Sequence, residues 1–210
     1  MRRTSPALLI VLGILVVLLF LGCGSYNGLV KSDETVKQAW GNVQSAYQRR
    51  ADLIPNLVET VKGEASFERG TLNDVISARA RATSMQVNPE NLTPENMQQF
   101  QQAQGQLSGA LSRLLVTVEQ YPTLRANDAF RDLQRQLEGT ENRINTERNR
   151  FNETVQPYNV KVRSFPTNIF AGIMGFKPRP PFEAAAGSEN APRVDFNTTQ
   201  PSVNFDSTGR

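Results

Sequence analysis

A heptad repetition of apolar residues begins at Leu29. Two adjoining rows follow this spacing: Leu29, Val36, Val43 and Leu57, and beside them Trp40, Tyr47, Ile54 and Val61. Apolar positions that recur in this way lie on one face of an α-helix, so the pattern predicts one long amphipathic helix. Pro55 interrupts the rows, but because they continue beyond it we expect a kink there rather than an end. Gly63 is expected to loosen the end of this helix.

Two further helices are predicted between residues 65 and 120. The first spans about 65–85 and carries Leu72, Val75, Ile76 and Ala82. The second spans about 94–120, and its apolar residues are Phe100, Leu107, Leu111, Leu114 and Val118. Thr93 followed by Pro94 is typical of an N-cap and the first helical position. Tyr121-Pro122 is expected to close this helix, since the residue before a proline is biased away from helix.

The last predicted helix has the most regular seam of the chain. Six aromatic or aliphatic residues lie seven apart: Phe130, Leu137, Ile144, Phe151, Tyr158 and Phe165. Pro157 falls inside the seam and is expected to bend it. A seam of this length needs partner helices, and the sequence has no strand pattern of matching strength. The sequence therefore predicts an all-α protein built as an antiparallel four-helix bundle.

The chain divides into three parts on this interpretation. Residues 1–24 form a membrane anchor or signal segment, residues 25–183 form the bundle, and residues 184–210 form a tail. The Gly172-x-x-Gly175 stretch has no strand before it and no long helix after it, so it is interpreted as a flexible turn and not as a phosphate loop. From Ala184 the chain is rich in Ser, Asn and Thr, which predicts a disordered end.

The N-terminal part is apolar and uncharged from Ala7 to Leu21, after Arg2 and Arg3. As a helix this run would rise about 22 Å, against a hydrocarbon core of about 30 Å, so its length leaves two interpretations open. It is either an uncleaved signal anchor or the signal peptide of a lipoprotein acylated at Cys23. Both interpretations place the bundle outside the cytoplasm, because the leading arginines are retained inside.

Composition excludes several classes of chemistry. The 210 residues include no His, which removes the commonest general base and the commonest metal ligand. Cys23 is the single cysteine, so no intramolecular disulfide can form. The net charge is +3, and its Lys and Arg are interspersed with acids rather than clustered with aromatics, which argues against nucleic-acid binding. We expect no catalytic residue, no cofactor and no metal site, since the carboxylates also lack Ca²⁺-loop spacing.

Six polar residues near the predicted seams are candidates for a site: Arg50, Asp52, Asn56, Glu119, Glu141 and Arg148. Arg50 takes a seam position between Val43 and Leu57, where an unpaired charge would be strongly destabilising. We therefore expect it to pair with Glu119 or Glu141. The six residues form either a structural ion network, which this argument favours, or a polar binding groove between helices.

The same segments resemble the LemA family of bacterial membrane proteins. The resemblance rests on Tyr26-Asn27-x-Leu29-Val30, Ala39-Trp40, Arg50-x-Asp52-Leu53-Ile54-Pro55-Asn56-Leu57-Val58, Glu119-x-Tyr121-Pro122-x-Leu124, Thr140-Glu141-x-x-Ile144 with Arg148, Tyr158-Asn159 and Phe165-Pro166-x-Asn168. It implies an N-terminal membrane segment and a helical bundle, and it implies no catalytic function or cofactor. The chain departs from the family at Phe67-Glu68 and Phe151-Asn152, where His-Glu and Tyr-Asn would be expected.

Two functions are consistent with these features. The first is a single-pass, membrane-anchored scaffold on the outer face of the bacterial cytoplasmic membrane, facing the periplasm or the cell exterior and binding a protein partner. The alternative is a bundle that binds a small molecule or a cell-envelope component near Arg50. A filled seam at Trp40 and Arg50 would favour the first function, whereas a cavity of a few hundred Å³ would favour the second.

Overall fold

The computed structural model describes the backbone of residues 6–64 and 67–183, and side chains from Gly24 onward within these ranges. The elements are α1 (Pro6–Lys62), α2 (Arg69–Ser84), the 3₁₀ turn η1 (Pro89–Asn91), α3 (Pro94–Val118), α4 (Pro122–Ala126), α5 (Asp128–Arg163) and α6 (Thr167–Met174). No strand occurs in these two ranges, so the predicted all-α class is confirmed for them.

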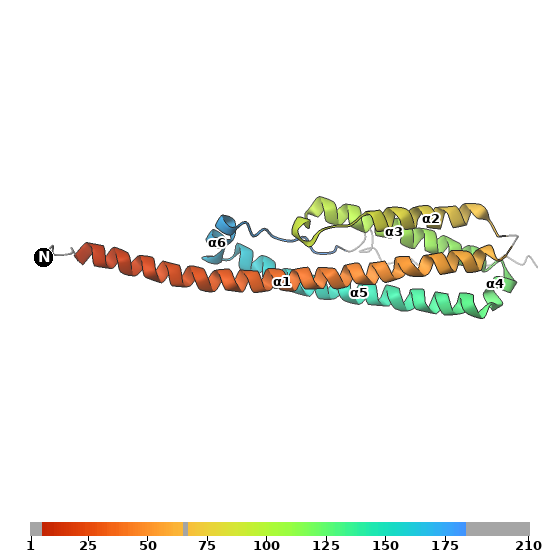
Figure 1. Cartoon of the computed structure of the whole chain (residues 1–210), viewed down its shortest axis with the longest axis horizontal. Coiled ribbons are helices and arrows are strands. Elements are labelled where there is room, and N and C mark those ends of the chain that lie inside the picture. Colours follow the sequence, from red (N-terminus) through yellow and green to blue (C-terminus); the bar gives the residue numbers. More distant parts are fainter. Residues whose placement is uncertain (1–5, 65–66, 184–210) are drawn as a thin grey trace, which may run out of the picture.

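The four long helices run alternately up and down, as Figure 1 shows. The most extensive pairing is between α1 and α5, and α2 packs mainly against α3. The short α4 leads into α5 at one end of the bundle, while α6 packs on α1 and α5 at the other end. The N-terminal part of α1 projects beyond the bundle at the end where α6 lies. The predicted antiparallel bundle of four long helices is therefore present, with two short helices added.

The predicted seams form the core. All eight residues of the two heptad rows of α1 are buried, as are all five predicted apolar residues of α3. Five of the six seam residues of α5 are buried as well. Two apolar clusters result, one around Trp40, Phe100 and Phe151 and the other around Ile54, Leu107 and Leu114. Heptad spacing predicted these buried residues because the apolar face of each long helix packs against a neighbouring helix.

Side-chain caps fix where the helices start. The Thr93 hydroxyl accepts a hydrogen bond from the Asn96 amide at 3.2 Å, with Pro94 at the first helical position, as predicted. The Asn127 side chain caps α5 by accepting from the Ala129 amide at 2.9 Å. Pro55 and Pro157 lie inside α1 and α5, and neither proline ends its helix.

Several local predictions were wrong. The helix α2 starts at Arg69 rather than near residue 65, and Ile76 on it is exposed. Phe165, the last residue of the α5 seam, is also exposed, because α5 ends at Arg163. The helix α3 ends at Val118, before Tyr121-Pro122, and Tyr121-Pro122 instead opens α4, since a proline is favourable at a first helical position.

The region interpreted as a flexible turn is helical. Gly172 lies within α6, and Gly175 forms its C-cap with a positive φ of 80°, a conformation that favours glycine. The Phe176 amide donates to the Ala171 carbonyl at 2.9 Å, which completes this cap. The interpretation as a flexible turn was wrong because α6, with eight residues, is too short for a helical period to be recognised.

Three predictions lie outside the described residues. They are the membrane role of the side chains from Ala7 to Leu21, the acylation of Cys23, and the disorder of residues 184–210. The backbone of Ala7–Leu21 and of Cys23 belongs to α1. Within the described residues, no helix has a stretch that is long and apolar enough to cross a membrane.

Candidate functional site

Arg50 is the centre of a polar network inside the bundle. It lies on α1, is only 2% exposed, and directs its guanidinium toward α3 and α5. Its Nη1 donates to Ser108 Oγ at 2.8 Å and to Glu141 Oε2 at 2.9 Å. Its Nη2 donates to Gln104 Oε1 at 2.7 Å. The Glu141 side chain is 47% exposed, so the ion pair reaches from the interior to the surface.

Gln104 extends this network to α2. Its side chain is buried, and while its Oε1 accepts from Arg50, its Nε2 donates to the Ala82 carbonyl at 3.2 Å. The network therefore joins α1, α2, α3 and α5, which otherwise pack mainly as two pairs. A polar cluster whose partners come from every long helix fixes their relative register, because a sliding helix would leave buried polar atoms unpaired.

One donor of Arg50 has no partner among the described residues. The Nε atom is buried and makes no hydrogen bond, at a cost of about 1 to 3 kcal/mol for such a group. The guanidinium carbon lies 5.1 Å from the centre of the Tyr47 ring, which adds a cation–π contact. Burial raises the pKa of Tyr47, so its hydroxyl stays neutral beside the network at physiological pH.

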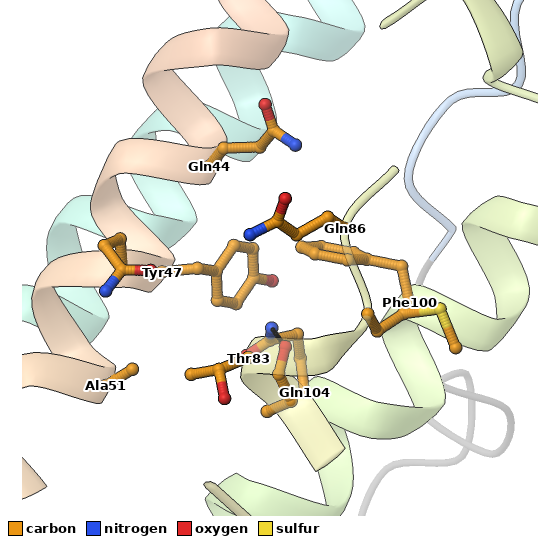
Figure 2. Close-up of a pocket in the computed structure, with 10 residues that line it drawn as sticks. Gln44, Tyr47, Ala51, Thr83, Gln86, Phe100 and Gln104 are labelled. Carbon is orange, nitrogen blue, oxygen red and sulfur yellow. Dashed lines mark hydrogen bonds between the residues drawn. The ribbon is translucent and has the colours of Figure 1, made fainter. Parts of the chain in front are cut away.

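A cavity of about 260 Å³ lies beside the network, between α1, the end of α2 and the start of α3. Four amide side chains line it, from Gln44, Gln48, Gln86 and Gln104. In Figure 2 the rings of Tyr47 and Phe100 approach each other between these amides. The remaining lining residues are Ala51, Ala82, Thr83 and Met85. No charged side chain lines the cavity, so its chemistry suits a small, uncharged polar ligand.

The six candidate residues do not form one site. Of the six, Arg50 and Glu141 form an ion pair with each other, and the charge of Arg148 acts on Tyr47 beside them. Glu119 is exposed at the C-cap of α3 and takes no part in the network. Asp52 is exposed and accepts a hydrogen bond from Gln48 at 2.7 Å, and Asn56 is exposed on the same helix. Helical phase explains this result, since on α1 only Arg50 of the three falls on the heptad seam.

Arg148 contacts the C-terminal strap, the extended segment of residues 176–183 that follows α6. Its guanidinium carbon lies 4.8 Å from the centre of the Phe182 ring, and its Nη2 donates to the Glu183 carbonyl at 3.2 Å. Phe182 is buried and stacks on Trp40 with ring centres 5.9 Å apart. The aromatic seam at Trp40 is therefore filled, and the open volume lies beside Arg50 instead.

Two asparagines on α5 that hold the strap were not predicted as site residues. Asn152 donates to the Phe182 carbonyl at 3.0 Å and accepts from the Phe182 amide at 2.8 Å. Asn159 makes the same pair of bonds with Arg179, each at 2.8 Å. The signal in the sequence was their seven-residue spacing beside the α5 seam, which places both amides on one face.

Arg179 connects the strap to the rest of the bundle. Its Nη2 donates to the buried carboxylate of Asp33 on α1 at 3.2 Å, and its Nη1 donates to the Glu90 carbonyl at 3.0 Å. The Tyr158 hydroxyl donates to the Lys177 carbonyl at 2.9 Å, and burial raises the pKa of this tyrosine. Within the described part of the chain, no three Cys, Asp or Glu residues gather in a way that could hold a metal ion.

The described residues form an all-helical bundle with a buried polar network around Arg50. A family model described as the LemA family matches residues 39–196, which is most of the chain. The chain belongs to the LemA family.

Relatives of known name are distant in sequence. The magnetosome protein MamQ 2 of Paramagnetospirillum magneticum is 27% identical over 169 residues, which cover 72% of this chain and 62% of the relative. MamQ of Magnetospirillum gryphiswaldense is 27% identical over 171 residues, with the same coverage. Protein LemA of Metamycoplasma hominis is 22% identical over 181 residues, covering 86% of this chain and 77% of that protein. The chain thus spans about three-fifths of the length of the magnetosome relatives.

Proposed function

We propose that this LemA-family chain is a membrane-anchored interaction module, with the apolar run Ala7–Leu21 as its anchor. The observation that carries the proposal is the continuity of α1, one helix from Pro6 to Lys62. Its backbone joins the apolar run directly to the buried rows of the bundle, and its first part projects beyond the bundle (Figure 1). An unbroken helix holds the bundle at a fixed height above the end of the anchor.

The proposed orientation places the bundle outside the cytoplasm of a bacterial cell. Arg2 and Arg3 precede the apolar run, and leading basic residues are retained on the cytoplasmic side. The chain would then cross the cytoplasmic membrane once, or be held there by a lipid on Cys23. Acylation can be recognised by a mobility shift that Cys23→Ala removes.

The proposed activity is binding of a protein partner, without turnover. The buried polar side chains around Arg50 direct their hydrogen bonds to one another, which stabilises a shape and leaves no paired acid and base in the cavity. Recognition then falls to the surface of the bundle and to the rim of the cavity, where Gln48 is exposed.

Photo-crosslinking in native membranes tests this function. A photoreactive residue at Gln48 of the full-length chain should give a discrete, light-dependent adduct, to be identified by mass spectrometry. The matched control carries the same residue at Glu138, which is exposed on α5. A folded chain without residues 1–24 should lose the adduct. If no position on the bundle surface gives a protein adduct in the membrane, the interaction assignment is wrong.

The amide-lined cavity supports a second candidate, the binding of a small polar molecule or cell-envelope component. A volume of about 260 Å³ with four glutamines and no charge can hold a few uncharged polar groups. Native mass spectrometry of the purified chain should then show a bound small molecule. Thr83→Trp, which fills the cavity, should remove it, whereas Thr146→Trp on the exposed face of α5 should not.

A further inference from the structure

Exposed apolar side chains gather around α6. Phe165 is 81% exposed, Ile169 52% and Ile173 73%. Ile169 and Ile173 lie four residues apart and therefore on one face of the helix, while Ala171 is buried against the bundle. No charged residue occurs from Ser164 to Phe176. Exposed apolar side chains gathered in one uncharged segment mark a contact with a partner or a membrane.

The position of α6 relates this surface to the proposed anchor. It lies at the end of the bundle from which α1 projects (Figure 1). The ring of Tyr26 meets that of Phe176 edge-on, with centres 6.2 Å apart, directly after α6. Tyr26 follows Leu21, the last residue of the apolar run, by about 7.5 Å along a helix that rises about 1.5 Å per residue. The helix α6 is therefore level with the first turns beyond the apolar run.

This height matches the headgroup layer of a bilayer. A bilayer of about 40 to 45 Å with a hydrocarbon core of about 30 Å has headgroup layers of about 5 to 8 Å on each side. If the apolar run of about 22 Å is centred in the core, it ends about 4 Å inside the edge of the core, and α6 then falls within the headgroup layer. Interfacial helices bury their apolar face by about 5 to 10 Å, which is within reach of side chains at this height.

The charges around α6 suit anionic lipids. Lys161, Arg163 and Lys177 are exposed and flank the uncharged segment in the sequence. Lys161 Nζ donates to Ser32 Oγ at 2.6 Å, which places this cation beside α1 at the same end of the bundle. The nearby carboxylate of Asp33 is buried and engaged by Arg179 and Lys37. Basic residues around an apolar face favour phosphate headgroups over a neutral surface.

We infer that α6 is an interfacial helix that docks the bundle on the bilayer, with Phe165, Ile169 and Ile173 entering the headgroup and acyl boundary. Lys161 and Lys177 contact lipid phosphates beside it. The inference rests on the proposed anchoring of the chain. Two attachments, the anchor and α6, fix the tilt of the bundle above the membrane, which one helix alone does not do.

Depth-dependent quenching tests this docking. The full-length chain is reconstituted into vesicles of equimolar phosphatidylcholine and phosphatidylglycerol, with an environment-sensitive fluorescent amino acid at Ile173. The matched control carries the probe at Val116, which is 63% exposed near the opposite end of the bundle on α3. We expect a blue-shifted emission at Ile173, quenched by lipids with a nitroxide high on the acyl chain, and neither effect at Val116.

Two outcomes separate docking from anchoring. If the chain floats with the vesicles while the probe at Ile173 is unquenched, the docking of α6 is wrong and the anchor stands. If the chain does not float with vesicles, the anchor is wrong and the docking falls with it. A blue shift that rises with the protein-to-lipid ratio and is not quenched by lipid would indicate a second copy on this face, which also overturns the inference.

A pair of substitutions controls for the probe itself. Ile169→Ser with Ile173→Ser should abolish quenching of a probe at Phe165 without releasing the chain from the vesicles, since the apolar face is lost and the anchor is intact. Val116→Ser should leave that quenching unchanged. Retained quenching in the double variant would show that the apolar face of α6 does not enter the bilayer.

Discussion

The side chain of Asn152 pairs with both backbone groups of Phe182, accepting from its amide at 2.8 Å and donating to its carbonyl at 3.0 Å. These two hydrogen bonds between the strap and α5 hold the Phe182 ring against Trp40 and Phe151. The ring centres of Trp40 and Phe151 lie 5.9 and 5.5 Å from that of Phe182. The strap is therefore part of the core of the bundle, although it has no secondary structure of its own.

Truncating the Phe182 side chain should destabilise the bundle strongly. Phe182→Ala removes a buried ring and is expected to lower the free energy of unfolding by about 3 to 5 kcal/mol. The matched control is Phe165→Ala, which removes an exposed ring and should change the free energy of unfolding by less than about 0.5 kcal/mol in detergent solution. Urea denaturation monitored by circular dichroism measures both. Equal effects of the two substitutions would contradict the packing of the strap.

The boundary of the folded unit should fall at the end of the strap. A chain that stops after Glu183 should keep its stability within about 0.5 kcal/mol, because it retains the contacts of Asn152 and Asn159. A chain that stops after Gly175 loses those contacts and should melt at a lower temperature. Calorimetry of the two truncated chains measures the difference in melting temperature. Equal melting temperatures would show that the strap contributes nothing to the stability of the bundle.

Both partners of the Arg50–Glu141 ion pair should contribute to stability. Arg50→Ala leaves the buried Gln104 without one partner and is expected to cost about 1 to 3 kcal/mol. Glu141→Ala leaves the buried guanidinium without this carboxylate and should cost at most about 3 to 5 kcal/mol, a cost that Ser108 and Gln104 reduce because both still accept from Arg50. A double-mutant cycle should give a coupling of about 0.5 to 3 kcal/mol between the two. A cost below about 1 kcal/mol for Arg50→Ala would contradict the buried network.

Stability should fall in base, partly because of Tyr47. Burial raises the pKa of Tyr47 in the folded state, so above pH about 10 the unfolded chain loses this proton first. The contribution of Tyr47 to the free energy of unfolding is therefore fully present below pH about 10 and is lost as the pH rises further. Tyr47→Phe should flatten the decline of unfolding free energy between pH about 9 and 11. The same slope in both chains would show that Tyr47 does not titrate differently on folding.

Heptad spacing predicted the long helices because each of them buries a continuous apolar stripe. Leu29 to Val61 on α1 and Phe130 to Tyr158 on α5 are the plainest cases. The same spacing placed Arg50 on a seam and so offered Glu141 as one of two partners. These predictions depend only on the helical period, which the sequence contains directly.

Features that depend on contacts between distant segments could not be predicted in the same way. The strap carries three prolines and no periodic pattern, and its place in the core depends on Asn152, Asn159 and Trp40, which precede it by many residues. The helix α6 is too short for a period to be recognised. The cavity depends on where the end of α2 meets Tyr47 and Phe100, which is a tertiary relationship.

Protease treatment of intact spheroplasts tests the central claim most directly, namely that α1 anchors the bundle outside the cytoplasm. The account predicts that protease added outside digests the bundle of the full-length chain, while a cytoplasmic marker protein stays intact. It also predicts that the undigested chain sediments with membranes and that a chain without residues 1–24 does not. Complete protection of the bundle in sealed spheroplasts, with digestion only after lysis, would contradict the account.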